Sequence, residues 1–336
     1  MKIVVDSAIP FIKDRFPKEI EVLYRDGKSI SADDVRDAQA LIVRTRTKCD
    51  ETLLGGSKVK LIATATIGKD HIDIPWCESK GIKVISSPGC NAPGVAQYVF
   101  SSLFKTGFNL DKDTLGIIGY GNVGSIVGEW AKKMGIKTLI NDPPRENKGL
   151  ADISYKSLEE VLKKSDAVTL HIPFTKYGEY PTYKLIGEKE LGLMKPGSIL
   201  INTSRGGVVE EKFLKDSLKQ RNIKAIIDVW EKEPDIDFEL LELSSISTPH
   251  IAGYSAEGKM RATRMVLEGI KDFFAMPVDL DGLECLPNSE LEISRSLIEL
   301  SYDPRKDSEK LKENPSQFEN LRNEYYYRRE PLFYNL

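Results

Sequence analysis

Short apolar runs alternate with polar, helix-compatible stretches along most of this chain. The first set of runs is KIVVD (2–6), ALIVR (40–44), KLIAT (60–64) and KVISS (83–87). From residue 114 the rhythm resumes with TLGIIG, KTLIND, AVTLHIP, SILINTS and KAIIDVW. Continuous apolar runs of this kind, separated by helical stretches, are typical of parallel strands buried on both faces. The pattern predicts an α/β fold with two doubly wound parallel sheets, Rossmann-like or flavodoxin-like.

One helix is expected to connect the two sets of strands. In NAPGVAQYVFSSLF, Asn91 suits a helix cap and Pro93 a first helical turn. After residue 274 the alternation stops, and the helix ending there can return to cover the first sheet. The first domain is then discontinuous, with the second inserted in it. The expected boundaries are 1–92 with 256–281 for the first domain, 93–255 for the second and 282–336 for a small C-terminal domain.

The C-terminal tail, residues 282–336, differs in composition from the rest. It holds five of the thirteen tyrosines, many charges and few large aliphatic residues. A segment of about 55 residues with this composition makes only a marginal core, so it must pack on something. Tyrosine is enriched at interfaces because its ring packs while its hydroxyl stays hydrogen-bonded. We expect the tail to join two chains as a homodimer; the alternative is that it folds back over its own chain.

Composition limits the classes of partner. The 336 residues are 40% hydrophobic and 29% charged, which favours packed cores over disorder. The net charge is −3 with no strongly basic half, so neither nucleic acid nor an anionic membrane is an expected partner. No apolar run has the length of a membrane-spanning helix, and the first residues lack the apolar stretch of a signal peptide. We expect a cytoplasmic protein.

Cysteine and histidine usage narrows the chemistry. The four cysteines are scattered without a CxxC pair, which argues against a disulfide framework and a structural zinc site. No metal is expected. Only three histidines, His71, His171 and His250, are available as an acid or base.

A glycine motif opens the second set of strands. Gly119, Gly121 and Gly124 form GxGxxG between an apolar run and a predicted helix. The first glycine allows a tight turn, the second lets the backbone approach a pyrophosphate, and the third lets helix and strand pack closely. The helix N-terminus then directs N–H groups at the phosphates. GxGxxG alone also occurs in ordinary turns, but this context predicts a dinucleotide site.

The next run, KTLIND, ends in Asp142, 142 − 124 = 18 residues after the third glycine. A carboxylate at this position hydrogen-bonds the ribose hydroxyls and repels a 2′-phosphate, which favours NAD over NADP. The alternative role is a helix cap, but we expect no helix to begin immediately at Asp142-Pro143-Pro144.

Arginine, glutamate and histidine follow three further strand ends. They are Arg205 in NTSRGGVVE, Glu233 in IIDVWEKEP and His250 in STPHIAGYS. Arg205 can hold a carboxylate bidentately, His250 can exchange a proton with a hydroxyl, and Glu233 can orient the imidazole. Singly, such an arginine is more often a surface ion-pair residue and such a histidine a structural one. Together, beside a dinucleotide site, they predict catalysis.

In this order and spacing, GxGxxG with Asp142, SRGG, DVWEKEP and TPHIAGY resemble the D-isomer-specific 2-hydroxyacid dehydrogenases. The resemblance runs from the first strand to the helix after His250. VRTRTK, ATATIGKDHID, SPGCNA and the tail resemble one branch of that family, which acts in vitamin B6 biosynthesis and carries an extra C-terminal dimerisation domain. Ordinary members of the family lack this tail.

The resemblance implies roles for individual residues. Arg205 corresponds to the arginine that holds the substrate carboxylate, Glu233 to the assisting glutamate and His250 to the acid/base. The residues at cofactor-binding positions are Gly119, Gly121, Asn122, Val123, Gly124, Asp142, Thr203, Ser204, Arg205, Asp228 and Gly253. The residues at substrate-binding positions are Thr45, Thr66 and Tyr254. Ile172 stands where a hydroxyl residue is frequent in the family.

The function implied by the resemblance is NAD-dependent oxidation of 4-phospho-D-erythronate. The substrate phosphate requires cations, and Arg44, Arg46 and Lys69 lie in loops that resemble the substrate-binding ones. Either arginine could instead be a solvated surface charge. Two alternatives remain open: another 2-hydroxyacid dehydrogenase, such as one acting on phosphoglycerate, and a non-catalytic NAD-sensing binding protein.

Overall fold

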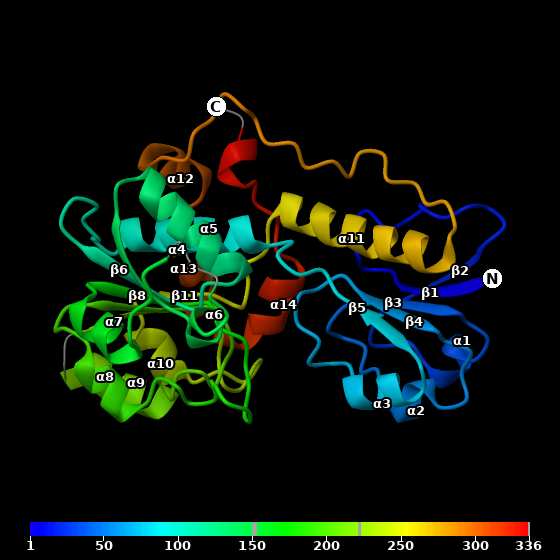
Figure 1. The fold of residues 1–336 in the computed structure, drawn as a ribbon, viewed down its shortest axis with the longest axis horizontal. Coiled ribbons are helices and arrows are strands. Elements are labelled where there is room, and N and C mark those ends of the chain that lie inside the picture. The colour runs from blue at the N-terminus through cyan, green and yellow to red at the C-terminus, as the bar shows by residue number, and fades with distance from the viewer. Residues whose placement is uncertain (150–152, 221–222, 335–336) are drawn as a thin grey trace. The chain divides into compact units, whose positions relative to one another are not determined.

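The computed structural model describes residues 1–149, 153–220 and 223–334, and the chain folds into two compact units (Figure 1). The first unit comprises Met1–Asn91 with Ala256–Pro287, and the second comprises Ala92–Ser255 with Asn288–Leu336. Residues 288–336, expected to belong to a separate domain, cluster with the second unit. The predicted α/β fold with two parallel sheets is confirmed.

The first unit contains five parallel strands in the order β2-β1-β3-β4-β5. This flavodoxin-like order reverses between β1 and β3. The apolar runs predicted four of these strands, whereas β2 was missed because this edge strand has only three half-buried positions between two exposed charged ones. The strands are β1 (Lys2–Asp6), β2 (Glu21–Arg25), β3 (Ala40–Val43), β4 (Leu61–Thr64) and β5 (Lys83–Ile85).

Helices cover both faces of this sheet (Figure 1). On one face, α11 packs Val266, Leu267 and Ile270 against Ile3 and Val5. Short helices and loops cover the other face, so that β1, β3 and β4 are buried on both sides. The helices are α1 (Ala32–Val35), α2 (Glu51–Leu54), α3 (Ile74–Ser79) and α11 (Ala256–Phe274).

The second unit contains six parallel strands in the order β11-β10-β9-β8-β6-β7. The order reverses between β6 and β8, and ligands of open α/β sheets bind at the carboxyl ends of strands beside such a reversal. The strands are β6 (Thr114–Ile118), β7 (Lys137–Asn141), β8 (Ala167–Leu170), β9 (Ile199–Asn202), β10 (Lys224–Ile227) and β11 (Ile246–Ser247).

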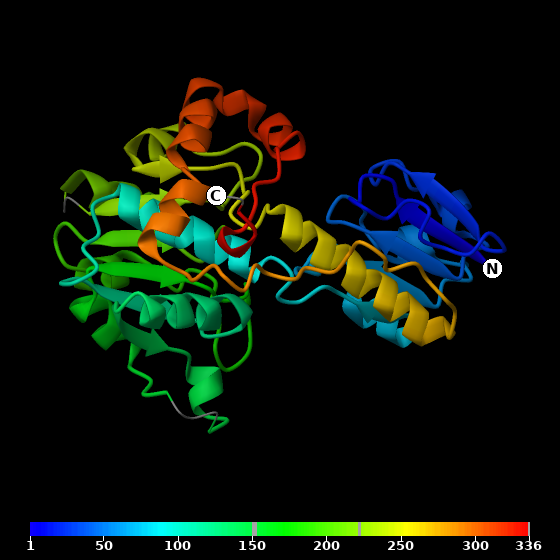
Figure 2. The same ribbon diagram turned by 90° about the horizontal axis from the view of Figure 1, so that it is seen from above.

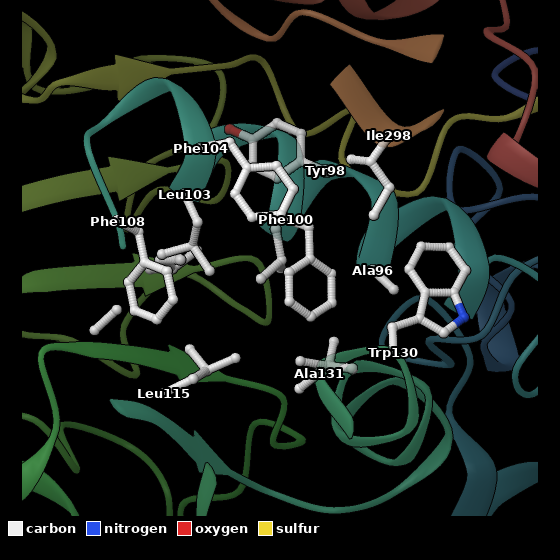
Figure 3. Close-up of a cluster of buried hydrophobic side chains, with 14 of the residues drawn as sticks. Ala96, Tyr98, Phe100, Leu103, Phe104, Phe108, Leu115, Trp130, Ala131 and Ile298 are labelled. Carbon is white, nitrogen blue, oxygen red and sulfur yellow. The ribbon is translucent and has the colours of Figure 1, made fainter. Parts of the chain in front are cut away.

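Two helical layers enclose the second sheet. Helices α4 and α5 pack on one face and α7 to α10 on the other (Figure 1). In the first layer, the rings of Phe100 on α4 and Trp130 on α5 stack 6.3 Å apart, beside Tyr98 and Leu103 (Figure 3). The helices are α4 (Ala92–Lys105), α5 (Asn122–Lys133), α6 (Pro143–Glu146), α7 (Leu158–Lys164), α8 (Glu188–Leu193), α9 (Glu211–Gln220) and α10 (Phe238–Leu243).

From residue 288 the tail packs on the second unit of its own chain (Figure 2). Its helices are α12 (Arg295–Ser301), α13 (Arg305–Glu313) and α14 (Phe318–Asn323). Ile298 joins the core that contains α4, whereas Leu311 and Phe318 join the core of the opposite layer. The tail therefore obtains its buried surface from the dinucleotide-type unit. Its last two residues lie outside the described part of the chain.

Among the residues that the structure describes, no helix is long and apolar enough to cross a membrane. No disulfide joins the four cysteines, all of which are described. No group of three or more histidine, cysteine or acidic side chains in these ranges could hold a metal ion.

Candidate active site

The predicted site residues lie in loops that follow the carboxyl ends of strands in the second sheet. The glycine motif follows β6, Asp142 follows β7, Arg205 follows β9, Glu233 follows β10 and His250 follows β11. Because all six strands are parallel, these loops emerge at one edge of the sheet.

The glycine motif has the geometry that its spacing predicts. Gly119 has a φ of 88°, and a Cβ on Gly124 would lie 2.0 Å from the Gly119 carbonyl oxygen, which no larger residue tolerates. At Gly121 a Cβ would meet no described atom within 4 Å. Gly121 also caps α5 without a side-chain hydrogen bond, so the first N–H groups of that helix can bind a phosphate.

Asp142 combines two roles. Its Oδ2 accepts the N–H of Tyr120 at 2.7 Å and its Oδ1 accepts the N–H of Arg145 at 3.0 Å. The prediction that no helix begins here is wrong: α6 starts at Pro143, because the first helical position needs no N–H donor. Each carboxylate oxygen has two lone pairs, so the cap leaves capacity for ribose hydroxyls.

The residues around this edge fit a bound dinucleotide. Thr203, directly after β9, has a buried Oγ1 with no hydrogen-bond partner among the described residues, so a polar ligand atom can pair with it. Asn122 and Val123 form the first turn of α5 beside the open space at Gly121. Ile172 instead directs its Cγ2 toward Gly119 and offers no hydrogen bond.

We predict that Asp142→Asn lowers the preference for NAD over NADP. Asparagine keeps an oxygen for the helix cap but removes the charge that repels a 2′-phosphate. The ratio of kcat/KM for NAD to that for NADP should fall about tenfold or more, the effect of losing charged hydrogen bonds to the ribose. Steady-state kinetics with both cofactors checks this, and an unchanged ratio would show that Asp142 does not contact the ribose.

Glu233 and His250 form a hydrogen-bonded pair. Nδ1 of His250 lies 2.8 Å from Oε2 and 3.0 Å from Oε1 of Glu233, and the Trp230 N–H donates to Oε1 at 3.1 Å. Burial acts to raise the pKa of Glu233, but the hydrogen bond and charge of His250, with the Trp230 N–H and the charge of Arg322, together hold that pKa below its ordinary value. With Nδ1 facing the carboxylate, Nε2 is the nitrogen that can exchange a proton with substrate.

Hydrogen bonds to Asp228 hold the loop that carries His250. Its carboxylate accepts the Thr248 hydroxyl and the Ile251 N–H, both at 2.7 Å, and the Ala252 N–H at 3.0 Å. His250 itself has a φ of 59°, a conformation that non-glycine residues adopt only when their surroundings impose it. Asp228 is 1% exposed, and burial raises its pKa. The structure thus gives this predicted cofactor residue a clear positioning role.

The Arg205 loop lies directly against the loop after β10. A Cβ on Gly206 would lie 1.8 Å from the carbonyl oxygen of Trp230, so only glycine allows this approach. Asn202 fixes the turn, because its side chain accepts the Ser204 N–H at 3.1 Å and donates to the Arg205 carbonyl at 3.1 Å. The guanidinium of Arg205 donates to the Ser204 carbonyl at 2.8 Å.

Two glutamates, Glu211 at the start of α9 and Glu231 in the loop after β10, hydrogen-bond each other's backbone. This pair predicts that stability depends on pH. Glu231 accepts the N–H of Glu211 at 3.2 Å, and Glu211 accepts that of Glu231 at 2.7 Å. Burial, with the charge of Glu231, raises the pKa of Glu211 to about 7. Because the pKa of Glu211 is higher in the folded chain than its ordinary value of 4.5, the folded state binds the proton more strongly. The stability gained in this way is fully present below pH 4.5 and is lost as the pH rises through about 7. Thermal melts from about pH 5 to 8 should show this loss in wild type and less of it in Glu211→Gln; equal slopes would contradict it.

The tail supplies two arginines that sequence reasoning missed. Arg328 is 7% exposed, and its guanidinium donates to six acceptors. The acceptors are the carbonyls of Gly94, Ile251, Ala252 and Tyr254, the side chain of Gln97 and the hydroxyl of Tyr325. Arg322 donates to the Tyr254 hydroxyl at 3.2 Å and lies 3.6 Å from Oε2 of Glu233. No local sequence signal marks either residue, because their partners lie far away along the chain.

The predicted substrate residues of the first unit follow adjacent strands. Thr45 and Arg46 follow β3, and Thr66 follows β4 at the same edge of the sheet. The Thr66 hydroxyl bonds the Gly68 carbonyl at 3.0 Å. Arg44 pairs with the fully buried carboxylate of Asp6 at 2.8 Å, so its charge is balanced within the fold.

The other two histidines differ from His250. His171, after β8, is half-buried; desolvation lowers its pKa to about 3, and it bonds Thr169 at 3.0 Å. His71 bonds Thr64 at 3.2 Å, and burial lowers its pKa. Neither has an acidic partner comparable to Glu233.

Comparisons with known proteins define the class. Residues 95–252 match the family described as D-isomer specific 2-hydroxyacid dehydrogenase, NAD binding domain. The D-lactate dehydrogenase of Aquifex aeolicus, solved with NAD and lactic acid, aligns with a TM-score of 0.65 at 28% identity over 82% of this chain and 96% of its own. The NAD-bound 3-phosphoglycerate dehydrogenase of Entamoeba histolytica aligns with a TM-score of 0.67 at 28% identity over 83% and 98%. The chain belongs to the D-isomer-specific 2-hydroxyacid dehydrogenases, which are NAD-dependent oxidoreductases.

Within that family, the similarity extends over the whole length to proteins named erythronate-4-phosphate dehydrogenase. The one from Bacteroides fragilis (strain YCH46) is 46% identical over 100% of this chain and 99% of its own. The one from Proteus mirabilis is 39% identical over 98% and 93%.

Proposed function

We propose that this chain oxidises 4-phospho-D-erythronate to (R)-3-hydroxy-2-oxo-4-phosphooxybutanoate with NAD, a step of pyridoxal 5′-phosphate (vitamin B6) biosynthesis. End-to-end similarity to two erythronate-4-phosphate dehydrogenases carries the proposal. A cytoplasmic location is part of it, because four cysteines without a disulfide suit a reducing compartment.

The reaction divides among three residues. NAD, when bound, would supply the nicotinamide carbon that accepts the hydride leaving C2 of the substrate. Nε2 of His250 takes the proton of the C2 hydroxyl, and Glu233 stabilises the resulting imidazolium through Nδ1. Arg205 binds the substrate carboxylate and stabilises the carbonyl oxygen that forms at C2.

For the remaining substrate atoms, the family resemblance implies that Thr45, Thr66 and Tyr254 supply hydroxyls. For the phosphate we propose Arg44 and Arg46, which follow β3; Arg44 also pairs with Asp6 at 2.8 Å. A cation is required here, since a phosphate dianion is poorly bound by neutral groups alone.

The test is NADH formation with three acids: 4-phospho-D-erythronate, D-3-phosphoglycerate and D-lactate. We expect kcat/KM for the first to exceed the others at least about tenfold, because a site built for one substrate's polar groups rejects analogues that leave them unpaired. Equal or faster oxidation of phosphoglycerate would overturn the substrate assignment. Hydride transfer to none of the acids would favour an NAD-sensing protein.

We also propose that the tail joins two chains as a homodimer. It lines most of a hollow of about 1010 Å³, and Leu300 and Tyr326 on its rim are 60% and 89% exposed. Exposed apolar and aromatic groups beside a concave surface suit a second copy of the same segment. Removing the tail would also remove Leu311 and Phe318 from the core of the second unit and expose the residues they cover. Point variants are therefore the cleaner test.

Sedimentation of the double variant Leu300→Glu, Tyr326→Glu should show monomers where wild type sediments as a dimer. Charge on both residues disfavours burial but touches no core position. Tyr177→Glu is the matched control, because Tyr177 is 88% exposed but lies outside the tail. A wild type that is monomeric, or a double variant that remains dimeric, would refute this role.

A further inference from the structure

We propose that Arg322, on α14 of the tail, is a positioning residue of the catalytic pair. It joins the Glu233 carboxylate to the Tyr254 hydroxyl and balances the negative charge that faces His250. This inference rests on the roles proposed above for Glu233, His250 and Tyr254.

The first observation is that three side chains meet at one oxygen. Oε2 of Glu233 lies 2.8 Å from Nδ1 of His250 and 3.6 Å from Nη1 of Arg322. The same guanidinium donates through Nε to the Tyr254 hydroxyl at 3.2 Å. Arg322 therefore bridges the acid that orients the base and a residue at a substrate-binding position.

The second observation is that the fold holds this arginine in place. Its side chain is 16% exposed, whereas Arg305 on the preceding helix is 54% exposed. Phe318, one turn before it on α14, is 1% exposed in the core. Tyr254 is enclosed by the edges of Tyr325 and Tyr327, with ring centroids 6.1 and 6.2 Å away. A solvated surface ion pair has none of these constraints.

Charge explains what the guanidinium does. The imidazole of His250 faces Glu233, which lies in the loop after β10. It also interacts electrostatically with Asp228, at the end of β10. Arg322, from α14, is the cation beside this acidic group. Without it, Glu233 would hold a proton on the imidazole more strongly, and the ring would be less ready to accept a substrate proton at a given pH.

Geometry explains why the residue is arginine. The planar guanidinium can bond Tyr254 through one nitrogen while another approaches Glu233. A lysine could restore the charge but not both contacts.

The test without turnover is a titration of ¹⁵N-labelled histidines by NMR. The chain has only three histidines, and His250→Ala assigns the relevant signals. In Arg322→Ala the titration midpoint of His250 should rise by about half a unit or more, and in Arg322→Lys it should return toward wild type. Arg305→Ala, which removes an exposed tail arginine, should leave it unchanged. A midpoint that is the same in Arg322→Ala and wild type would overturn the inference.

Kinetics supplies the second arm. For Arg322→Ala we expect kcat to fall about tenfold, equivalent to the loss of one charged hydrogen bond, and the acid limb of kcat/KM to move to higher pH. Arg322→Lys should recover the pH profile while KM stays raised, because the bond to Tyr254 is lost. If the wild type fails to oxidise 4-phospho-D-erythronate, the proposed function fails, while the NMR titration still decides the role of Arg322.

Discussion

Replacing His250 with alanine should lower kcat by about 10²–10⁴-fold while NAD affinity stays near wild type, the usual effect of removing a general base. His250 is the histidine whose Nδ1 is held by a carboxylate at 2.8 Å. The glycine motif and Asp142 do not depend on its side chain. Turnover is measured by NADH formation and cofactor affinity by quenching of tryptophan fluorescence.

A second variant separates the chemistry from the backbone. Because His250 has a φ of 59°, alanine there adds backbone strain, whereas asparagine tolerates this conformation and provides no base. His250→Asn should therefore fold as wild type and lose as much kcat as His250→Ala. Wild-type kcat in either variant would show that another group removes the proton.

Replacing Arg328 with methionine should lower the free energy of unfolding by about 3 kcal/mol or more, because several buried carbonyls lose their donor. These carbonyls belong to Gly94 on α4 and to Ile251, Ala252 and Tyr254 in the loop after His250. Methionine keeps much of the apolar stem, so packing changes little. kcat should fall as well, since the loop is no longer fixed. Urea unfolding followed by tryptophan fluorescence measures the first effect.

Two further variants serve as comparisons for the unfolding of Arg328→Met. Arg328→Lys keeps the charge but has fewer donors, so it should unfold between wild type and Arg328→Met. Arg305→Ala removes a solvated tail arginine that pairs with Asp303 and should unfold at the wild-type urea concentration. If Arg328→Met also unfolds there, Arg328 does not clamp the loop.

Much of the cofactor site could be predicted because its signals are local. The central strands are continuous apolar runs since both faces are covered, and the three glycines stand where one turn of backbone requires them. Glu233 and His250 are 17 residues apart, yet each follows a strand of the same parallel sheet, so topology alone brings them together.

What could not be predicted depends on distant or context-dependent contacts. Edge strand β2 offers only a short apolar run, residues 22–24, which are half-buried and flanked by exposed charges. Pro143 resembled a helix breaker, although it is the first residue of α6. Arg322 and Arg328 lie in the charged, tyrosine-rich tail, and their partners are up to 234 positions away along the chain. Long-range pairing of this kind has no signature in residue spacing.

The position of Arg328 near the end of the chain determines when its hydrogen bonds to the His250 loop can form during synthesis. Synthesis must continue for 328 − 250 = 78 residues after His250 before the guanidinium that secures its loop exists. A nascent chain that has emerged only through residue 255 already carries the glycine motif, Asp142 and the Glu233–His250 pair, but it lacks the hydrogen bonds through which Arg328 joins Ile251 and Ala252 to Gly94 on α4. The hydrogen bonds from Arg328 that secure the catalytic loop can therefore form only after the tail has been translated.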